Sequence, residues 1–249
     1  SFWKEFRDIA HEAKKDTLLI SEIFGDTSQW LQGDRFDGTM NYSFREAMTD
    51  YFAIKRINNK EFADSLAYLY SMYSFEALSS CQNLLSSHDV KRFLNRCGND
   101  EDGILGAIFL QATFPGIAGI YYGDEIGLGG ADDPFNREPF PWHNEESWNS
   151  TILDFTKKLM NIKKSNAIFK YGRFELLDEN EQFVAFRRIL KDESMLCIID
   201  RSKSNDNFNI ISNAHSVNLI HGDCTANLKE GMIKVTNNVG NIGIIIHEQ

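Results

Sequence analysis

Leu18-Leu19-Ile20-Ser21-Glu22-Ile23-Phe24 and Leu84-Leu85-Ser86-Ser87-His88-Asp89 are two short apolar runs that each lead into an acidic residue. Runs of this length are typical of strands buried in a parallel sheet. In a βα barrel the carboxyl ends of the strands form one face, and that face carries the reactive side chains. The two runs therefore predict a βα fold in which Glu22, His88 and Asp89 lie on one face.

The first part of the chain alternates short apolar runs with helical patterns, which indicates βα units on a parallel sheet. The predicted strands are Thr17–Ile23, Phe36–Asn41, Ala77–Ser86 and Ile117–Tyr122, and the predicted helices are Phe44–Ile57, Asn59–Met72, Gly103–Phe114 and Glu146–Asn166. Four strands are half of an eight-stranded barrel, which takes about 250 residues when complete. Because half a barrel leaves two open parallel edges, either another polypeptide closes it or the rest has been removed.

The remainder of the chain has a different sequence pattern, in which short β-prone runs alternate with Asp, Asn, Gly and Ser. The runs are Phe174–Leu177, Phe183–Ile189, Met195–Ile199, Phe208–Ile211, Val217–Ile220, Met232–Val235 and Ile242–His247. Their spacing is typical of an antiparallel sandwich. The sequence thus predicts an α/β protein, with half of a (β/α)8 barrel in residues 1–168 and an all-β antiparallel sandwich domain in residues 169–249.

The 249 residues carry a formal net charge of −10, with 36 acidic against 26 basic residues. Nucleic-acid binding needs a basic surface, so this balance argues against a nucleic-acid partner and suits a neutral substrate. No apolar run approaches the roughly 20 residues of a membrane helix, and no signal-peptide pattern opens the chain, although an upstream signal stays open. The four cysteines lack CxxC spacing, which favours packed thiols in a reducing compartment such as the cytoplasm.

Polar residues follow each of the four predicted strands: Glu22, then Asn41 and Tyr42, then His88 and Asp89, then Tyr122 to Glu125. A single strand-end acid is more often a helix cap or part of an ion pair. Four such clusters in succession are harder to explain as caps, and they favour a catalytic face. Because Glu22 lies between apolar residues, we expect it in partly desolvated surroundings, which suit a general acid.

His88 and Asp89 would point to opposite sides of a regular strand, so one of them must lie in the turn that follows. Asp89 could then accept hydrogen bonds from sugar hydroxyls and stabilise positive charge on the ring, while His88 donates to a neighbouring hydroxyl. The alternative for His88 is a structural role, which is commoner for a lone histidine. Arg92 either pairs with an acid in the same mouth or solvates the start of a helix.

Glycosidases need two carboxylates, and these lie about 5 to 5.5 Å apart when the configuration is retained. Glu22 and Asp89 are two strand-end carboxylates, but the pair does not include an obvious nucleophile. The sequence therefore supplies at most part of a retaining site.

Several aromatic residues lie beside these acids, where a ring can stack on a sugar or pack in the core. Both interpretations stay open for Phe24, Trp30, Phe135 and Trp142, whereas Tyr122 could stack on a sugar but lies in a segment where a supporting role is favoured. The loop from Gly127 to His143 is too long and polar for a simple connector, and we expect it to face the substrate. Arg137 lies in this loop and is a further candidate for substrate binding.

Four motifs follow one another in the first 165 residues: Ser-Glu-Ile-Phe at 21–24, Phe-Asp-Gly-Thr-Met-Asn-Tyr at 36–42, Ser-His-Asp at 87–89 with Arg-Phe-Leu at 92–94, and Ile-Tyr-Tyr-Gly-Asp-Glu-Ile-Gly at 120–127. In this order they resemble the α-amylase superfamily of glycoside hydrolases. The pattern Trp30-Leu31-x-Gly33-Asp34-x-Phe36-Asp37 and the ending Met40-Asn41-Tyr42 resemble the subgroup of neopullulanases, cyclomaltodextrinases and maltogenic amylases.

The resemblance implies roles for the strand-end residues. Glu22 matches the general acid/base on barrel strand five, and Asp89 with His88 matches the transition-state-stabilising acid and its sugar-binding histidine on strand seven. Residues 1–168 would then be strands five to eight, the C-terminal half of the barrel. The nucleophilic aspartate, its nearby arginine and a further sugar-binding histidine belong to strands three and four, and the resemblance implies that the nucleophile lies a few residues before Ser1.

Two departures from the family pattern bear on specificity more than on the reaction: Ser21 replaces a glycine, and Ser86-Ser87 stands where many members have Asn next to His. The metal-site residues of the family are mostly upstream, so we expect no metal and no cofactor in this chain. The predicted substrate-binding residues are His88, Phe24, Trp30, Asn41, Tyr42, Arg92, Tyr122, Arg137 and Trp142, and the predicted catalytic residues are Glu22 and Asp89.

The sequence thus predicts the C-terminal portion of a retaining α-glucan hydrolase for maltooligosaccharide, cyclodextrin or pullulan, which is inactive alone because it lacks the nucleophile. The expected partners are an α-glucan oligosaccharide and the N-terminal half of the barrel, on the same or a separate polypeptide, and a homodimer is open for the intact protein. One alternative is a noncatalytic glucan-binding or assembly subunit that completes a barrel with another chain. Another is a transglycosylase of the same superfamily.

Overall fold

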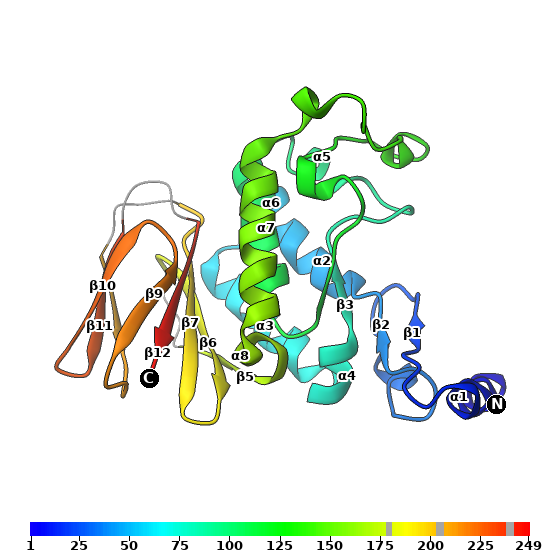
Figure 1. Ribbon diagram of the computed structural model, residues 1–249, viewed down its shortest axis with the longest axis horizontal. Helices are drawn as coiled ribbons and strands as arrows, with labels where there is room; N and C mark the ends of the chain where they lie inside the picture. The colour runs from blue at the N-terminus through cyan, green and yellow to red at the C-terminus, as the bar shows by residue number, and fades with distance from the viewer. Residues whose placement is uncertain (178–180, 203–206, 238–241) are drawn as a thin grey trace.

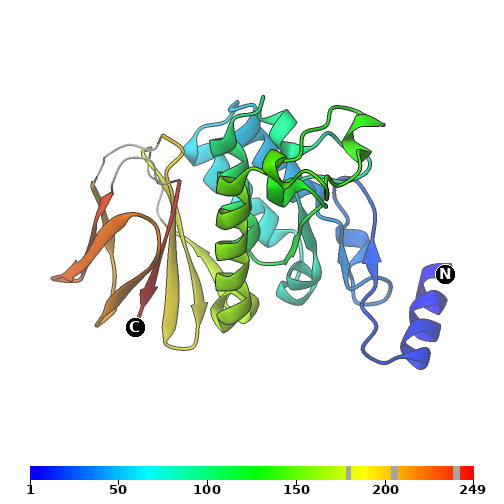
Figure 2. The same cartoon turned by 45° about the horizontal axis from the view of Figure 1, so that its top comes forward.

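The computed structural model describes residues 1–177, 181–202, 207–237 and 242–249. An α/β region with short parallel strands comes first in the chain, and antiparallel sheets follow it (Figure 1). Helix α1 (Phe2–Ala13) lies at one end of the molecule and the antiparallel sheets lie at the other, as both ribbon views show (Figures 1 and 2). No helix in the described ranges is long and apolar enough to cross a membrane.

Four short parallel strands lie side by side in chain order. They are β1 (Ile20–Ser21), β2 (Gly38–Thr39), β3 (Gln82–Leu84) and β4 (Ile117–Gly119). Pairs β1–β2 and β3–β4 are parallel, and a parallel bridge from Met40 to Gln82 joins the two pairs. Among the described residues these strands form an open sheet and do not close a barrel.

The α/β region also contains helices after α1. They are α2 (Tyr42–Met48, continued by a π-helical turn at Thr49–Ala53), α3 (Asn59–Ser71), α4 (Phe75–Ser80), α5 (Phe93–Arg96), α6 (Glu101–Thr113), α7 (Ser150–Ser165) and α8 (Ala167–Tyr171). Of these, α2, α3, α6 and α7 lie between the parallel strands and the antiparallel sheets (Figure 1). Short 3₁₀ turns lie at Ser28–Trp30, Asp124–Ile126, Phe135–Arg137 and Glu145–Ser147.

The predicted strand Ala77–Ser86 is wrong in its first half, which belongs to α4. Ser74 caps this helix, because its hydroxyl accepts a hydrogen bond from the Ala77 amide at 3.2 Å. Serine is a preferred N-cap residue, since its side-chain oxygen satisfies an amide that has no partner within the helix. The apolar residues after it, including the buried Leu78, therefore pack from a short helix, and the chain becomes extended only from Gln82.

The described part of the antiparallel region contains eight strands: β5 (Arg173–Leu176), β6 (Val184–Leu190), β7 (Glu193–Ile199), β8 (Asn207–Ile211), β9 (Val217–His221), β10 (Cys224–Lys229), β11 (Met232–Asn237) and β12 (Gly243–Glu248). A five-stranded sheet has the order β5-β6-β7-β12-β9, and a three-stranded sheet has the order β10-β11-β8. Side chains from both sheets form one apolar cluster, which includes Leu196 and Ile246 from the first and Ile233 and Val235 from the second.

Strand β10 is absent from the sequence prediction. Its inward positions hold Cys224, Ala226 and Leu228, and polar residues alternate with them. Cysteine and alanine give a weak strand signal, because β-propensity rests on branched and aromatic side chains. Pairing with β11 over six residues makes the segment a strand.

One apolar core runs through the α/β region and into the five-stranded sheet. It includes Phe109 and Phe114 near the end of α6 together with Phe174, Phe186 and Cys197 from the sheet. The domain boundary between residues 168 and 169 stays a prediction, since the packing is continuous across it.

Two basic side chains close the carboxyl end of α6, where helix carbonyls have no partner within the helix. Lys163 Nζ of α7 donates to Ala112 O at 3.1 Å and to Phe114 O at 3.4 Å, and Arg188 Nη1 of β6 donates to Thr113 O at 2.6 Å. Burial lowers the pKa of Lys163 to about 7 and that of Arg188 to about 10. Cations are favourable at this end of a helix, so the contacts tie α6 to both regions.

Candidate active site

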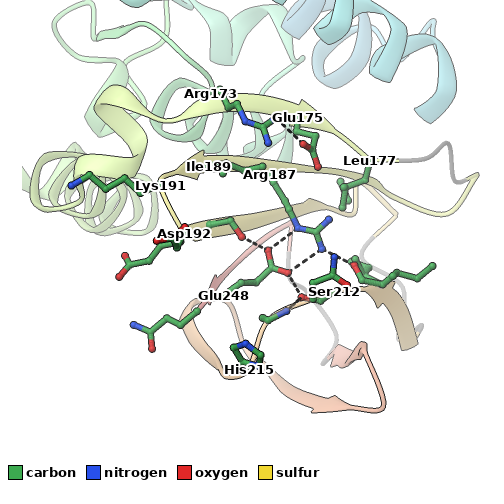
Figure 3. A pocket seen from close by; sticks show the side chains of 18 of the residues that line it. Arg173, Glu175, Leu177, Arg187, Ile189, Lys191, Asp192, Ser212, His215 and Glu248 are labelled. Atoms are coloured by element: carbon green, nitrogen blue, oxygen red, sulfur yellow. Dashed lines mark hydrogen bonds and ion pairs between the residues drawn. The ribbon is translucent and has the colours of Figure 1, made fainter.

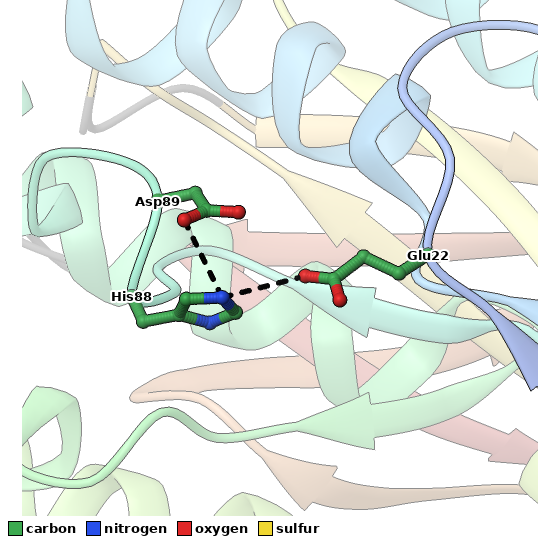
Figure 4. Close-up of side chains that lie close together, drawn as sticks. All are labelled: Glu22, His88 and Asp89. Carbon is green, nitrogen blue, oxygen red and sulfur yellow. Dashed lines mark ion pairs between the residues drawn. The ribbon is translucent and has the colours of Figure 1, made fainter.

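Glu22, His88 and Asp89 converge at the carboxyl ends of the parallel strands (Figure 4). His88 Nε2 lies 3.7 Å from Glu22 Oε1 and 3.4 Å from Asp89 Oδ1, so the imidazole stands between the two carboxylates. One polar atom from each side chain lies within 4.8 Å of the other two. Residues far apart in the chain thus form one polar cluster, which we call the Glu22–His88–Asp89 cluster.

The two strands reach this cluster in different ways. Glu22 directly follows β1, whereas β3 ends at Leu84 and the chain then makes a tight turn that is closed by the bridge between Ser87 and Val90. Both His88 and Asp89 lie in this turn, although the sequence required only one of them to leave the strand. The Ser87 hydroxyl accepts a hydrogen bond from the Asp89 amide at 3.2 Å, which bends the turn toward the cluster.

The cluster is open to solvent in this chain. The side chains of Glu22, His88 and Asp89 are 45%, 49% and 41% exposed. The desolvated surroundings expected for Glu22 are therefore not found, and that prediction is wrong for the described structure. The reason is its position, because β1 is paired only with β2 and forms an edge of the open sheet.

Arg137 is the nearest cation to Asp89 among the predicted site residues. Its Nη2 lies 3.8 Å from Asp89 Oδ1, its Nε donates to His88 O at 3.0 Å, and it also pairs with Asp133 at 3.2 Å. The loop that the sequence assigned to the substrate face therefore folds over the turn that carries His88 and Asp89.

Tyr42 and Phe24 form a wall next to the cluster. Their rings are stacked with centroids 3.9 Å apart, and the Tyr42 hydroxyl is 3.0 Å from Ser87 Oγ. Tyr42 is buried, which raises the pKa of its phenol, while Phe24 presents its other face to solvent at 57% exposure. Phe24 is thus placed where a ligand could stack on it.

Asn41 is buried and turned inward. Its Oδ1 caps α2 by accepting from the Phe44 amide at 3.1 Å, and its Nδ2 donates to Asn83 Oδ1 at 2.9 Å. Both ends of the amide are occupied in the protein, so Asn41 supports the end of β2 and does not reach the Glu22–His88–Asp89 cluster.

Arg92 is fully buried in a different place. Its Nη1 donates to Tyr122 O at 2.6 Å and lies 3.4 Å from Asp124 Oδ1, and its Cζ lies 4.7 and 4.8 Å from the ring centroids of Tyr121 and Tyr122. Burial raises the pKa of Asp124 to about 7. Arg92 therefore pairs with an acid, which is one of the two roles that the sequence left open. The pair is buried behind the Glu22–His88–Asp89 cluster, so Arg92 is out of reach of a ligand.

The family model described as "Alpha amylase, catalytic domain" matches residues 1–167. The chain belongs to the α-amylase family. The resemblance expected from the sequence motifs is thus confirmed, and the matched residues include the whole Glu22–His88–Asp89 cluster.

Known members resemble this α-amylase family chain over most of its length. A cyclomaltodextrinase of Thermoanaerobacter pseudethanolicus is 36% identical over 82% of this chain and 36% of its own length. Neopullulanase 2 of Thermoactinomyces vulgaris is 36% identical over 80% of this chain and 34% of its own length. The chain spans about a third of the length of these relatives. A solved structure of a debranching enzyme from Nostoc punctiforme superposes with a TM-score of 0.89 at 29% identity, covering 99% of this chain and 55% of that one.

Three predicted substrate-binding aromatics of this family member lie outside the cluster. Trp30 packs against the core beside Phe36, under the guanidinium of Arg35. Tyr122 donates its hydroxyl to Glu138 O at 3.0 Å and thereby anchors the long loop. Trp142 is 67% exposed and packs on Phe140. Of these three, Trp142 alone presents a largely free ring.

The sequence prediction missed Asn136, which contacts the turn carrying His88 and Asp89, and Asp133, which pairs with Arg137. The only sequence signal for Asp133 is its i,i+4 spacing to Arg137. For Asn136 there is no local signal, because its partners come from a turn nearly 50 positions earlier in the chain.

A cavity of about 810 Å³ lies elsewhere, among strands of the antiparallel region (Figure 3). Arg187 crosses its wall to meet Glu248, and Ser212 and His215 lie beside them. None of the predicted site residues is among the described residues that line it. The candidate active site of the family member is therefore the open cluster at the parallel strand ends.

Proposed function

We propose that this chain supplies the acid/base and the transition-state-stabilising carboxylate of a retaining α-glucan hydrolase. The observation that carries the proposal is the convergence of Glu22 and Asp89 on His88, at the strand ends of a chain that belongs to the α-amylase family. The relatives named cyclomaltodextrinase and neopullulanase support maltooligosaccharide, cyclodextrin or pullulan as the substrate class.

The proposed reaction uses the two carboxylates for different tasks. Glu22 donates its proton to the glycosidic oxygen while an aspartate from outside residues 1–249 attacks the anomeric carbon and forms a covalent glycosyl intermediate. Glu22 then takes a proton from the water that releases this intermediate. Asp89 stabilises the positive charge that develops on the sugar ring, and His88 donates a hydrogen bond to a ring hydroxyl.

We assign the described parallel strands, β1 to β4, as strands five to eight of a (β/α)8 barrel in this proposal, and residues 169–249 as a β-sandwich domain. The parallel order of β1 to β4 supports this, as does the exposure of the cluster on the side of β1. The N-terminal half of the barrel would cover Glu22 and supply the desolvation that a general acid needs. We also place the protein in the cytoplasm, which is supported by four buried free cysteines.

The substitution Glu22→Gln tests the acid/base role in the full-length protein that contains this chain. Removing a general acid typically costs 10²–10⁴-fold in rate, so we expect turnover of maltotriose and of cyclodextrin to fall by roughly three orders of magnitude. The matched control is Glu175→Gln, in an exposed pair with Arg173 on β5, which should leave turnover unchanged. A Glu22→Gln enzyme with a near-wild-type rate would refute the assignment.

The isolated 249-residue chain provides a second arm. Because the proposed nucleophile lies outside it, we expect no glucan hydrolysis by the purified chain, and clear hydrolysis would show that the site is complete without further residues. Product analysis on maltotriose separates hydrolysis from transfer, since a transglycosylase accumulates products longer than the substrate.

A further inference from the structure

The turn that carries His88 and Asp89 depends on contacts from outside itself. Two hydrogen bonds close the turn from within. Val90 N donates to Ser87 O at a long distance of 3.5 Å, and the Asp89 amide donates to Ser87 Oγ. Both functional side chains are nearly half exposed, so little packing fixes them directly. The backbone of the turn therefore decides where His88 and Asp89 point.

Asn136, in the loop from Gly127 to His143, donates hydrogen bonds to the backbone of this turn. Its Nδ2 lies 2.9 Å from His88 O, 3.0 Å from Val90 O and 3.4 Å from Ser87 O. A side-chain amide has two hydrogens to donate, so the two shorter contacts use both and the third is at most shared. One side chain thus binds carbonyls on either side of Asp89.

The orientation and burial of Asn136 make this a specific interaction. The side chain is fully buried, and the reversed amide would place Oδ1 against three carbonyl oxygens. Only the donating orientation is therefore consistent with the surroundings. Without Asn136, His88 O would keep, among the described residues, only the hydrogen bond from Arg137 Nε at 3.0 Å, and Val90 O would lose the donor at 3.0 Å. These part-buried carbonyls would lose hydrogen bonds at a cost in free energy, which ties the turn to the loop.

The loop reaches the turn because Gly130 has no side chain. A Cβ at this position would lie 2.5 Å from Phe135 O and 2.9 Å from the Cα of Asn136, closer than real contacts allow. Gly130 is itself held on α5 and the residue before it, since its amide donates to Asn95 Oδ1 and its carbonyl accepts from the Arg92 amide at 3.2 Å. Asn136 is thus seated on a fixed segment.

We propose that Asn136 is a positioning residue that locks the Ser87–Val90 turn and thereby sets His88 and Asp89 against Glu22. The inference rests on the proposed function, because it concerns the same site. A displacement of about 1 Å in a catalytic group can lower a rate by about 100-fold. The donated hydrogen bonds of Asn136 are therefore required for turnover, although Asn136 itself lies behind the reacting atoms.

The test compares Asn136→Asp with Asn136→Ala in the full-length protein that contains this chain. Aspartate keeps the shape of asparagine but donates at most one hydrogen, and only when it is protonated. If Asn136 acts as a donor, both variants lower kcat by about 100-fold, with KM changed less than about threefold. If it only fills space, Asn136→Asp keeps a kcat within about twofold of wild type while Asn136→Ala does not, and that result would overturn the inference.

Hydrogen exchange gives a readout that is independent of catalysis. In Asn136→Asp the amides of residues 87–92 should exchange at least tenfold faster, because the turn has lost the hydrogen bonds that Asn136 donates. The amides of α6 should exchange as in wild type. Unchanged exchange at residues 87–92 refutes the inference whether or not the protein hydrolyses glucan. Faster exchange in a protein with no glucan hydrolysis upholds the lock and counts against the proposed function alone.

The matched control is Asn149→Asp. Asn149 lies at the start of α7, and the variant loses the hydrogen bond that the Asn149 side chain donates to Glu101. It should leave kcat and the exchange of residues 87–92 unchanged. If the Asn136 variants do not fold, the wild-type protein still decides the question by NMR. The two side-chain amide protons of Asn136 should exchange slowly with solvent, and rapid exchange would show that they are not held by the turn.

Discussion

The α/β region and the antiparallel region each hold a buried carboxylate beside an arginine, and the two pairs differ in how completely they are satisfied. In the antiparallel region Arg187 binds both oxygens of Glu248 at 2.8 and 3.0 Å, and the serines at 194 and 212 donate to the same carboxylate at 2.6 Å each. In the α/β region Arg92 makes a single 3.4 Å contact with Asp124, and its Nε and Nη2 have no protein partner among the described residues.

This difference shows which of the two pairs is fully hydrogen-bonded within the described residues. In the antiparallel region the buried carboxylate of Glu248 is fully hydrogen-bonded by side chains of the same region, as is usual for buried charges. The α/β region leaves buried donors unpaired beside Tyr122, just beyond β4 at the edge of the open sheet. That pattern supports the proposal that further parallel strands pack there, and three substitutions can break or sharpen the comparison.

The largest effect on stability is expected from Glu248→Gln. Glu248 is buried and the Arg187 side chain is only 15% exposed, so removing the carboxylate leaves Arg187 without its counter-charge, which typically costs about 3 kcal/mol. The control Glu175→Gln breaks an exposed pair and should cost less than about 1 kcal/mol. Urea unfolding measures both free energies of unfolding, and equal losses would show that the saturated pair contributes no more than a surface pair.

The same variant has a defined pH dependence. Burial opposes ionisation of Glu248, but hydrogen bonds from Arg187, Ser194 and Ser212 outweigh it and lower its pKa from 4.5. A lowered folded-state pKa adds stability above the unfolded value, and that stability is lost as the pH falls through the folded value. Wild type should therefore lose more stability than Glu248→Gln when the pH falls below 4.5.

An intermediate effect is expected from Lys163→Met at the junction of the two regions. Burial lowers the pKa of Lys163 to about 7 from 10.5, so between these values the unfolded state binds more protons than the folded state. The free energy of unfolding then rises with pH across this window. Relative to Lys163→Met, wild type should gain about 2 kcal/mol between pH 7 and 9.

Thermal or urea unfolding at several pH values measures this difference. Arg188 also faces the end of α6 and stays charged across the window, so it does not cancel the effect. If the free energies of unfolding of wild type and Lys163→Met differ by a constant amount from pH 7 to 9, that would contradict the lowered pKa of Lys163.

The smallest effect is expected from Asn58→Ala at the start of α3. Asn58 accepts a hydrogen bond from the Glu61 amide at 2.9 Å, and the Glu61 side chain accepts one from the Asn58 amide at 2.8 Å. Loss of such a capping box costs about 1 kcal/mol. Ser65→Ala within α3, which loses a hydroxyl hydrogen bond to Glu61 O, is the control, and an equal loss of stability in both would show that the cap adds nothing.

Local signals explain which parts of the fold could be predicted from the sequence. Helix α3 begins and ends within one residue of its predicted range, because Asn58 and Glu61 form a cap that is readable in the sequence. The predicted strand at Ala77–Ser86 failed in its first half because Ser74 starts a helix whose apolar residues also suit a strand. Strand β10 was missed because Cys224, Ala226 and Leu228 give a weak strand signal, and its hairpin pairing with β11 makes it a strand.

The sequence by itself determined the family and the residue types of the site, since the motifs around Glu22 and Asp89 lie in their expected order and the family model matches residues 1–167. Only the tertiary structure decided which polar residues meet. Arg92 and Asn41 turn inward, while Asn136, with no local signal, reaches the turn of His88 and Asp89. The physical reason is that a motif fixes a residue's place along a strand, whereas hydrogen-bond partners between distant segments are set by how loops pack over the strand ends.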